Sequence, residues 1–225
     1  MSSEPRIVEV RERVLKQNDL LARELRREFR RAGVHVVSLV SSPGSGKTAL
    51  LEQLLTRLRH SQRVGALVGD LATENDAARL QRSGAPVKQI TTGTICHLDA
   101  AMVSNALSAW TLREFDIIFI ENVGNLVCPS SYDLGENLRM VALSVTEGED
   151  KPLKYPTIFN SADIAVITKM DLASAVEFDL DAAQRNIQTV RPGMNVYPLS
   201  AKTGFGMEAL LQHLSRWERP ARSAG

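Results

Sequence analysis

The feature that most constrains this chain is a glycine-rich loop between a β-like run and a helical run. Residues 37–48 read Val-Ser-Leu-Val-Ser-Ser-Pro-Gly-Ser-Gly-Lys-Thr. Gly44 and Gly46 allow the backbone to approach a phosphate closely, and the loop N–H groups and the helix N-terminus favour an anion. In such a loop Lys47 reaches the β- and γ-phosphates, and the Thr48 hydroxyl binds Mg²⁺. The pattern predicts a nucleoside triphosphate site.

The rest of the chain alternates between β-rich and helical runs. We predict strands over residues 35–41, 64–70, 87–91, 116–121, 163–168 and 195–199, with a further strand near 140–145. Helices are predicted near residues 48–59, 74–83, 97–113, 177–189 and 207–217. Strands rich in Val and Ile that alternate with helices are typical of parallel βαβ units. We therefore expect an α/β fold with a mostly parallel sheet and helices on both faces.

The first thirty-odd residues follow a different pattern. Apolar residues recur at spacings of mostly three and four, at Ile7, Val10, Val14, Leu21, Leu25 and Phe29, which predicts an amphipathic helix ended by Gly33. The arginines of its second half (23, 26, 27, 30 and 31) are typical of a solvated face, and a docking surface is the alternative. We divide the chain into an N-terminal helical segment (1–33), a P-loop domain (34–218) and a disordered tail (219–225).

Composition excludes several classes of protein. The chain has 27 Lys and Arg against 26 Asp and Glu, a formal net charge of +1, so we expect neither nucleic acid nor an anionic membrane as partner. The apolar runs are far shorter than the roughly 20 residues that cross a bilayer. Two cysteines are too few for a disulfide scaffold. A reduced, cytoplasmic protein follows.

Two later motifs predict which base is bound. Residues 168–171 read Thr-Lys-Met-Asp and resemble the Asn-Lys-x-Asp element of GTPases, in which Asp171 would accept hydrogen bonds from guanine N1–H and the 2-amino group and the Lys169 stem would lie along the base. Residues 200–202, Ser-Ala-Lys, resemble the element that closes over guanine O6. Each motif alone could be incidental, but their order after a phosphate loop favours guanine.

Two positions depart from the usual patterns. Ser41 stands where the phosphate loop normally begins with glycine, and Thr168 stands where the guanine element has asparagine. Neither removes the groups that carry the chemistry, because Lys47, Thr48 and Asp171 are retained.

Acidic residues close two strands and are suited to a cation. Asp70 and Glu121 can hold Mg²⁺ directly or through water, together with Thr48. Glu121-Asn-Val-Gly124 resembles the Asp-x-x-Gly sensor of GTPases, in which the glycine N–H reports the γ-phosphate. We see no arginine finger or catalytic glutamine, so we expect slow intrinsic hydrolysis. The predicted catalytic residues are Lys47, Thr48, Asp70, Glu121 and Gly124.

Three residues could bind a soft metal. Cys96 and His97 precede a helical run, and Cys128 follows the γ-phosphate sensor. Thiolate and imidazole suit Zn²⁺ and Ni²⁺, although a closed structural zinc site needs four ligands. From the residues alone, small buried thiols and a chance Cys-His pair remain the alternative.

A succession of motifs, in one order, now points to a known family. They are Ser41-Ser-Pro-Gly-Ser-Gly-Lys-Thr48, Gly69-Asp-Leu-Ala-Thr73, Gly93-Thr-Ile-Cys-His-Leu-Asp99, Glu121-Asn-Val-Gly-Asn-Leu-Val-Cys-Pro129 and Asp150-Lys-Pro-Leu-Lys-Tyr-Pro156. Over residues 5–218 the chain resembles the nickel-incorporation GTPases of nickel–iron hydrogenase maturation, the HypB family of SIMIBI-class P-loop GTPases.

The resemblance implies a GTP-dependent homodimer that handles nickel or zinc at its interface, with Cys96, His97 and Cys128 as ligands. It implies delivery to the hydrogenase large-subunit precursor with HypA, a small zinc-containing partner. Lys151 and Lys154 would contact nucleotide across the dimer, with surface lysines as the alternative. The predicted nucleotide-binding residues are Pro43, Gly44, Ser45, Gly46, Lys47, Thr48, Ala49, Lys151, Lys154, Lys169, Asp171, Ser200, Ala201 and Lys202.

Other interpretations stay open at this point. A small-molecule kinase could use the same phosphate loop, and a nucleotide-gated scaffold could carry structural zinc. A urease-type nickel GTPase is closer, but the Cys-Pro-His signature of that group is absent here.

Overall fold

The computed structural model describes residues 4–70 and 75–216, without the side chains of residues 4–9 and 11. One seven-stranded sheet has the order β3-β2-β4-β1-β5-β6-β7, and every neighbouring pair is parallel. The strands are β1 (His35–Ser41), β2 (Val64–Asp70), β3 (Val87–Thr91), β4 (Ile117–Glu121), β5 (Leu138–Ser144), β6 (Ile164–Thr168) and β7 (Asn195–Pro198). The parallel α/β prediction is confirmed.

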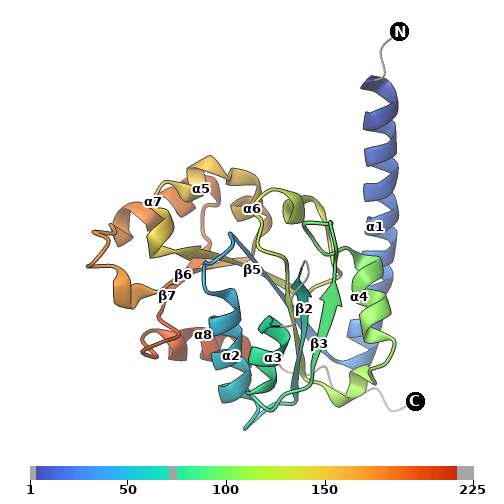
Figure 1. Cartoon of the computed structure of the whole chain (residues 1–225), viewed down its shortest axis with the longest axis horizontal. Coiled ribbons are helices and arrows are strands. Elements are labelled where there is room, and N and C mark those ends of the chain that lie inside the picture. The colour runs from blue at the N-terminus through green and yellow to red at the C-terminus, as the bar shows by residue number, and fades with distance from the viewer. Residues whose placement is uncertain (1–3, 71–74, 217–225) are drawn as a thin grey trace.

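Helices cover both faces of the sheet (Figure 1). On one face, α2, α3 and α8 pack against alternate strand residues such as Val37 and Leu39. On the other, α1 and α4 cover one half of the sheet, around Val36, and α6 and α7 cover the other half. The α-helices are α1 (Glu4–Ala32), α2 (Lys47–Leu58), α3 (Asn75–Gln81), α4 (Ala100–Leu107), α5 (Lys151–Lys154), α6 (Pro156–Ser161), α7 (Leu180–Val190) and α8 (Met207–Ser215).

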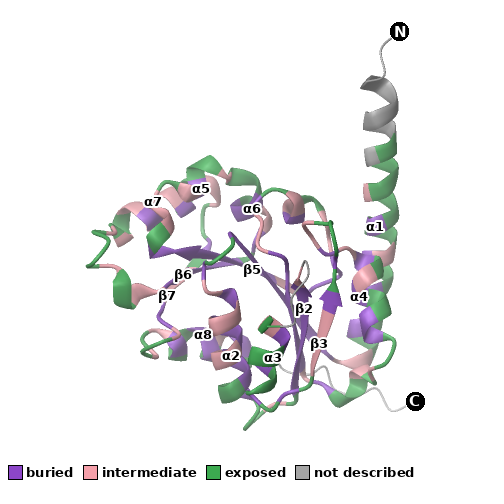
Figure 2. Cartoon of the chain, viewed as in Figure 1, coloured by how far each residue is buried: buried purple, intermediate pink, exposed green. Residues whose placement is uncertain are grey.

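The N-terminal helix α1 extends well beyond the sheet (Figure 1). Its second half packs into the domain through the buried side chains of Ala22, Leu25 and Phe29. Val10 and Val14, nearer the N-terminus, are exposed. Figure 2 shows the outer part of α1 as mostly exposed where its side chains are described. The predicted amphipathic helix is therefore present, and among its described side chains the buried apolar ones, Ala22, Leu25 and Phe29, lie in its second half.

Several element boundaries differ from the sequence prediction. The helix predicted over residues 97–113 is the shorter α4, because the Asp99 side chain accepts from the N–H of Met102 at 2.8 Å and so caps the helix. Residues 97–99 consequently stay in a loop. The strand expected near 140–145 is β5, which begins at Leu138. It lies inside the sheet, between β1 and β6. The short helices α5 and α6 were not anticipated.

Some predictions lie outside the described residues. They are the first residue of the helix predicted over 74–83, the last residue of the helix predicted over 207–217, and the tail at 219–225. Among the described helices, none combines the length and apolar character that crossing a bilayer requires.

Candidate functional site

A pocket of about 450 Å³ opens at the carboxyl ends of the central strands. Its walls include the phosphate loop after β1, Asp70 at the end of β2, and Glu121 and Gly124 at and after the end of β4. Open parallel sheets bind ligands at this edge because every strand ends and every βα loop begins there. The three acidic and glycine positions predicted from separate motifs therefore line one cavity with Lys47 and Thr48.

The phosphate loop has the backbone conformation that its glycines allow. Gly44 and Gly46 have φ angles of 70° and 93°, in the left-handed region that side chains disfavour. The buried Lys47 Nζ donates to Ser41 Oγ at 2.9 Å, and Ser41 Oγ also pairs with the hydroxyl of Ser45. Ser41, the departure from the usual loop, thus holds the lysine. Burial lowers the pKa of Lys47, and the negative charge of Glu121 opposes that shift.

Thr48 and Glu121 meet at the pocket floor. The Thr48 hydroxyl donates to Glu121 Oε1 at 2.7 Å. Burial raises the pKa of Glu121 to about 7, although the hydrogen bond from Thr48 and the charge of Lys47 act in the opposite direction. The other oxygen, Oε2, is buried and has no hydrogen-bond partner among the described residues. An unpartnered buried carboxylate oxygen beside a hydroxyl fits a hard cation such as Mg²⁺.

Gly124 packs directly against the phosphate loop. A Cβ added at this glycine would lie 2.8 Å from the Cα of Pro43, too close for any side chain. The backbone after β4 therefore reaches the phosphate loop only because residue 124 has no side chain. This contact fits the proposed role of the Gly124 N–H as a sensor of the γ-phosphate.

A second, smaller pocket of about 200 Å³ lies beside the phosphate loop. It is lined by residues of both predicted guanine elements, including Lys169, Asp171, Ala201 and Lys202. The hydroxyl of Ser200 donates to Asp171 Oδ1 at 2.6 Å, which links the two elements and orients the carboxylate. The structure thus brings the elements after β6 and β7 together.

Thr168 and Lys169 connect this pocket to the phosphate loop. The Thr168 hydroxyl donates to the carbonyl of Ser45 at 2.6 Å, so the residue that replaces asparagine braces the loop. Lys169 Nζ donates to the carbonyl of Gly44 at 2.7 Å, which lays the lysine stem across the loop.

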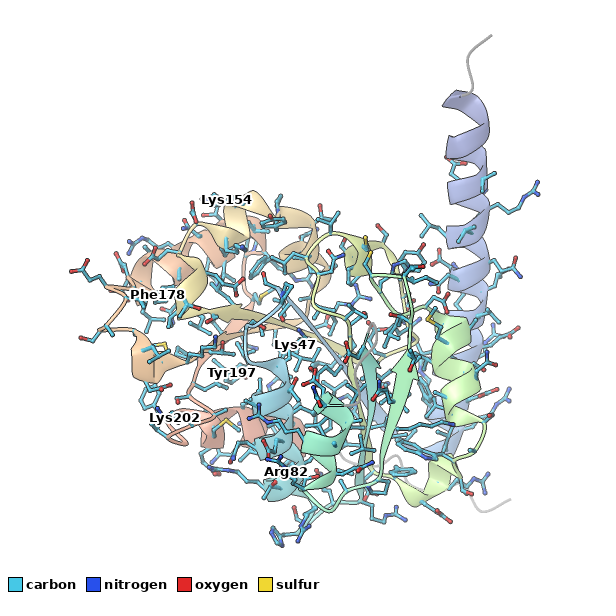
Figure 3. The ribbon with its side chains drawn as sticks, viewed as in Figure 1. Lys47, Arg82, Lys154, Phe178, Tyr197 and Lys202 are labelled. Carbon is cyan, nitrogen blue, oxygen red and sulfur yellow. The ribbon has the colours of Figure 1, made fainter. Side chains whose placement is uncertain are left out.

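Lys151 and Lys154 lie elsewhere, on α5. Lys154 Nζ pairs with Asp150 at 2.6 Å, and Lys151 Nζ lies 3.7 Å from Glu147. Neither lysine lines the two pockets. In Figure 3, Lys154 is at the edge of the molecule and Lys47 is near its centre. Nucleotide contact by this pair stays a prediction that needs a second subunit.

The predicted soft-metal ligands come together in space. The sulfur atoms of Cys96 and Cys128 lie 2.9 Å apart, and Cys96 Sγ lies 4.0 Å from His97 Nδ1. All three ligand atoms lie within 4.8 Å of one another, and neither cysteine is in a disulfide. Two sulfurs and one imidazole suit Ni²⁺ or Zn²⁺, and three protein ligands leave a coordination position open.

Leu98 explains how Cys96 reaches Cys128. The two cysteines follow β3 and β4, which are separated in the sheet by β2. The loop after β3 crosses the end of β2, where the fully buried Leu98 packs on Gly69. A Cβ at Gly69 would lie within 2.9 Å of three Leu98 carbons, so this crossing depends on the glycine.

His97 and the cysteine loops are held by neighbouring side chains. The His97 ring stacks on Tyr132 with centroids 3.9 Å apart, and burial lowers the pKa of His97. A neutral imidazole is the form that binds metal. The side-chain oxygen Oδ1 of Asn125 accepts from the N–H groups of Val127 at 2.7 Å and Cys128 at 3.4 Å. These contacts hold the ring and the start of the Cys128 turn.

Sequence reasoning did not single out five residues that line the larger pocket: Gly69, Asp76, Arg79, Asn122 and Val123. Arg79 comes from α3 and is engaged by the Glu52 carboxylate, with Nε to Oε2 at 2.8 Å. No motif marks it. Asn122 directly follows the predicted cation ligand Glu121, which is the one signal that could have drawn attention to it.

Comparisons with known proteins identify relatives of this chain. Residues 35–198 match the family described as CobW/HypB/UreG, nucleotide-binding domain. The hydrogenase maturation factor HypB of Rhizobium leguminosarum bv. viciae is 47% identical over 207 residues, which is 92% of this chain and 69% of that protein.

Two solved structures are also similar. The structure of HypB from Helicobacter pylori in complex with nickel has a TM-score of 0.84 at 39% identity, over 88% of this chain and 94% of that one. HypB from Archaeoglobus fulgidus has a TM-score of 0.83 at 38% identity, over 89% and 98%.

Proposed function

Because this chain belongs to the HypB family of CobW/HypB/UreG nucleotide-binding proteins, we propose that it is a GTP-hydrolysing nickel chaperone of hydrogenase maturation. Its cargo would be inserted into the large-subunit precursor of a nickel–iron hydrogenase. A HypA-type zinc protein would be its partner in that transfer. Two cysteines that form no disulfide suit a reducing compartment, and we place the protein in the cytoplasm.

One observation carries the proposal: the metal ligands adjoin the nucleotide pocket. Cys128 lies four residues after Gly124, whose backbone contacts the phosphate loop. The Sγ atoms of Cys96 and Cys128 are 2.9 Å apart. A closed structural zinc site would use four protein ligands. An open three-ligand set beside a phosphate sensor favours cargo that is bound and released.

The hydrolytic step uses residues of the larger pocket. Lys47 would leave its contact with Ser41 and bind the β- and γ-phosphates, while Thr48 and Glu121 would hold Mg²⁺ with the help of Asp70. Bound Mg²⁺ would neutralise developing charge on the phosphates. Water attacks the γ-phosphorus, and GDP and inorganic phosphate leave. Because Arg79 is engaged by Glu52, we expect slow turnover without a partner.

Hydrolysis would alter the metal site through the segment after β4. With GTP bound, the Gly124 N–H would contact the γ-phosphate and hold this segment against the phosphate loop. Two chains would bring two Cys-His-Cys sets together in a homodimer, where Lys151 and Lys154 would reach the partner's nucleotide. Loss of the γ-phosphate would loosen the segment and weaken both the dimer and the grip on nickel.

The test is a nickel titration with size measurement, in GDP and in a non-hydrolysable GTP analogue. We expect Cys96→Ala and Cys128→Ala to lower nickel affinity by at least about 100-fold, more than is typical for loss of a supporting residue. His97→Ala should also weaken binding, whereas His60→Ala, on an exposed turn, should not.

Three outcomes would contradict the proposal. Nickel binding that survives both cysteine substitutions would place the cargo site elsewhere. A single zinc that does not exchange would favour the nucleotide-gated scaffold. Phosphate transfer to an added acceptor in place of water would favour a kinase.

A further inference from the structure

Two buried asparagines hold the segment that carries His97, each from a different side. The Oδ1 of Asn122 accepts from the N–H of Leu98 at 3.0 Å, and the Oδ1 of Asn18 accepts from the N–H of Ala100 at 2.9 Å. The exposed fractions of the two asparagines are 2% and 5%. Buried N–H groups keep their acceptors because an unmade bond in the interior is costly. The segment is therefore fixed to both side chains.

The two asparagines belong to different parts of the molecule. Asn122 follows Glu121 at the end of β4 and lines the larger pocket. Its backbone N–H donates to the carbonyl of Leu39 in β1 at 3.0 Å. Asn18 belongs to α1, and its Nδ2 donates to the carbonyl of Asp133 at 2.9 Å. Of the two asparagines, Asn122 is the one that lines the pocket.

The carboxamide oxygen of Asn122 binds two segments at once. It accepts from Leu98 and also from the N–H of Val123 at 2.9 Å, on the way to Gly124. A carbonyl oxygen has two lone pairs, and both are used here by backbone N–H groups. Movement of the backbone between Glu121 and Gly124 therefore moves the acceptor of the residue next to His97.

We propose that Asn122 is a positioning residue that couples the placement of His97 to the state of the bound nucleotide. The inference rests on the proposed function, since it requires nickel binding that depends on the nucleotide. The 121–124 segment lies against the phosphate loop through Gly124. When loss of the γ-phosphate releases this segment, the Asn122 oxygen moves with it and carries the N–H of Leu98 along. The His97 ring, stacked on Tyr132, then changes its position relative to the thiols of Cys96 and Cys128.

The experiment measures nickel affinity in GDP and in the non-hydrolysable GTP analogue, both at verified saturation. In wild-type protein we expect the two affinities to differ by about 5- to 150-fold, the range typical of coupled sites. In Asn122→Ala the ratio of the two nickel affinities should fall to about 1, because the variant lacks the side-chain oxygen that links the 121–124 segment to Leu98. Asn122→Asp should restore the ratio, because a carboxylate oxygen accepts from the same two N–H groups.

Asn18→Ala is the matched control. It removes an equally buried acceptor from the same segment, but on the side of α1, so nickel affinity should change alike in both nucleotide states and the ratio should persist. The absorption of the nickel–thiolate bond, recorded in both states, should differ in wild type and coincide in Asn122→Ala.

The outcomes separate the two proposals. A wild-type ratio of one would overturn the nucleotide-dependent chaperone and this inference together. A wild-type ratio that persists in Asn122→Ala would overturn the inference alone. If the nickel affinities in GDP and in the GTP analogue also became equal in Asn18→Ala, general loosening of the segment would be enough to remove the nucleotide dependence. That result would overturn the specific role of Asn122.

Discussion

The Thr48 hydroxyl and the Glu121 carboxylate are hydrogen-bonded at 2.7 Å, although 73 residues separate them in the sequence. This contact joins the start of α2 to the end of β4 across the carboxyl edge of the sheet. Glu121 has its pKa raised to about 7 by burial, and its second oxygen is unpartnered among the described residues. The pair is therefore assembled before any cation binds.

Thr48→Val tests this assembly. Valine keeps the shape of threonine but removes the oxygen that would bind Mg²⁺, so we expect GTP hydrolysis to fall by roughly 100-fold or more, in line with the several kcal/mol that a metal contributes. Thr48→Ser keeps the hydroxyl and should retain most of the activity. Single-turnover hydrolysis with varied Mg²⁺ measures both variants, and full activity in Thr48→Val would contradict the assignment.

Asp171→Asn tests the choice of base. The carboxylate would accept two hydrogen bonds from guanine, and each bond to a charged group is worth at least about 10-fold in affinity. The variant should bind GTP more weakly and xanthosine triphosphate more tightly, because the 2-oxo group of xanthine accepts from the new amide. Ser200 can still donate to the remaining oxygen. Nucleotide titrations measure the change, and Asp181→Asn, on the exposed surface, should leave both affinities unaltered.

Phe29→Ala tests how α1 is held. Phe29 is fully buried in the core that α1 shares with α4, and removing a buried phenyl ring costs about 3–5 kcal/mol of unfolding free energy. Val14→Ala, at an exposed position on the same helix, should change it by less than about 0.5 kcal/mol. Urea unfolding compares the two. Similar stability losses would mean that α1 does not pack as described.

His35 predicts a pH dependence of stability. Burial, followed by the charge of His213, lowers the pKa of His35 from 6.5 to about 4. The unfolded chain therefore binds more protons than the folded one in this window, so stability is present above pH 6.5 and is lost as the pH falls toward 4.

His35→Val should remove that contribution. From about pH 7.5 to about pH 5, wild-type protein should lose on the order of 2 kcal/mol more unfolding free energy than the variant. Urea unfolding at the two pH values supplies the numbers. Equal losses in both proteins would show that His35 titrates normally in the folded state.

Much of the fold was predictable because local signals were strong. The bounds predicted for β1, β2 and β3 match those of the structure. β1 and β2 are short, mostly apolar runs that end at a polar residue, whereas β3 has only two apolar residues, Val87 and Ile90. The helix predicted to begin at residue 97 begins at Ala100 instead, because the Asp99 side chain accepts from the N–H of Met102 and caps the helix there. The helices α5 and α6 were missed because each is shorter than two helical turns.

The two departures from motif acquire their meaning only in three dimensions. Ser41 accepts from Lys47, and Thr168 donates to the carbonyl of Ser45. Sequence comparison with a motif marks such residues as exceptions. Their hydrogen bonds, to groups from 4 to 123 residues away, show that both support the phosphate loop.

The sequence by itself determined the parallel α/β architecture, the phosphate loop and the residue types suited to guanine and a soft metal, because these depend on local periodicity and on chemistry carried by short motifs. The tertiary structure decided that Cys96 and Cys128 meet at 2.9 Å. The strands β3 and β4 that precede these cysteines are not neighbours in the sheet. The loop after β3 crosses the end of β2 only because Leu98 fits against Gly69. Strand order and such close packing arise from contacts between distant segments, so no local pattern records them.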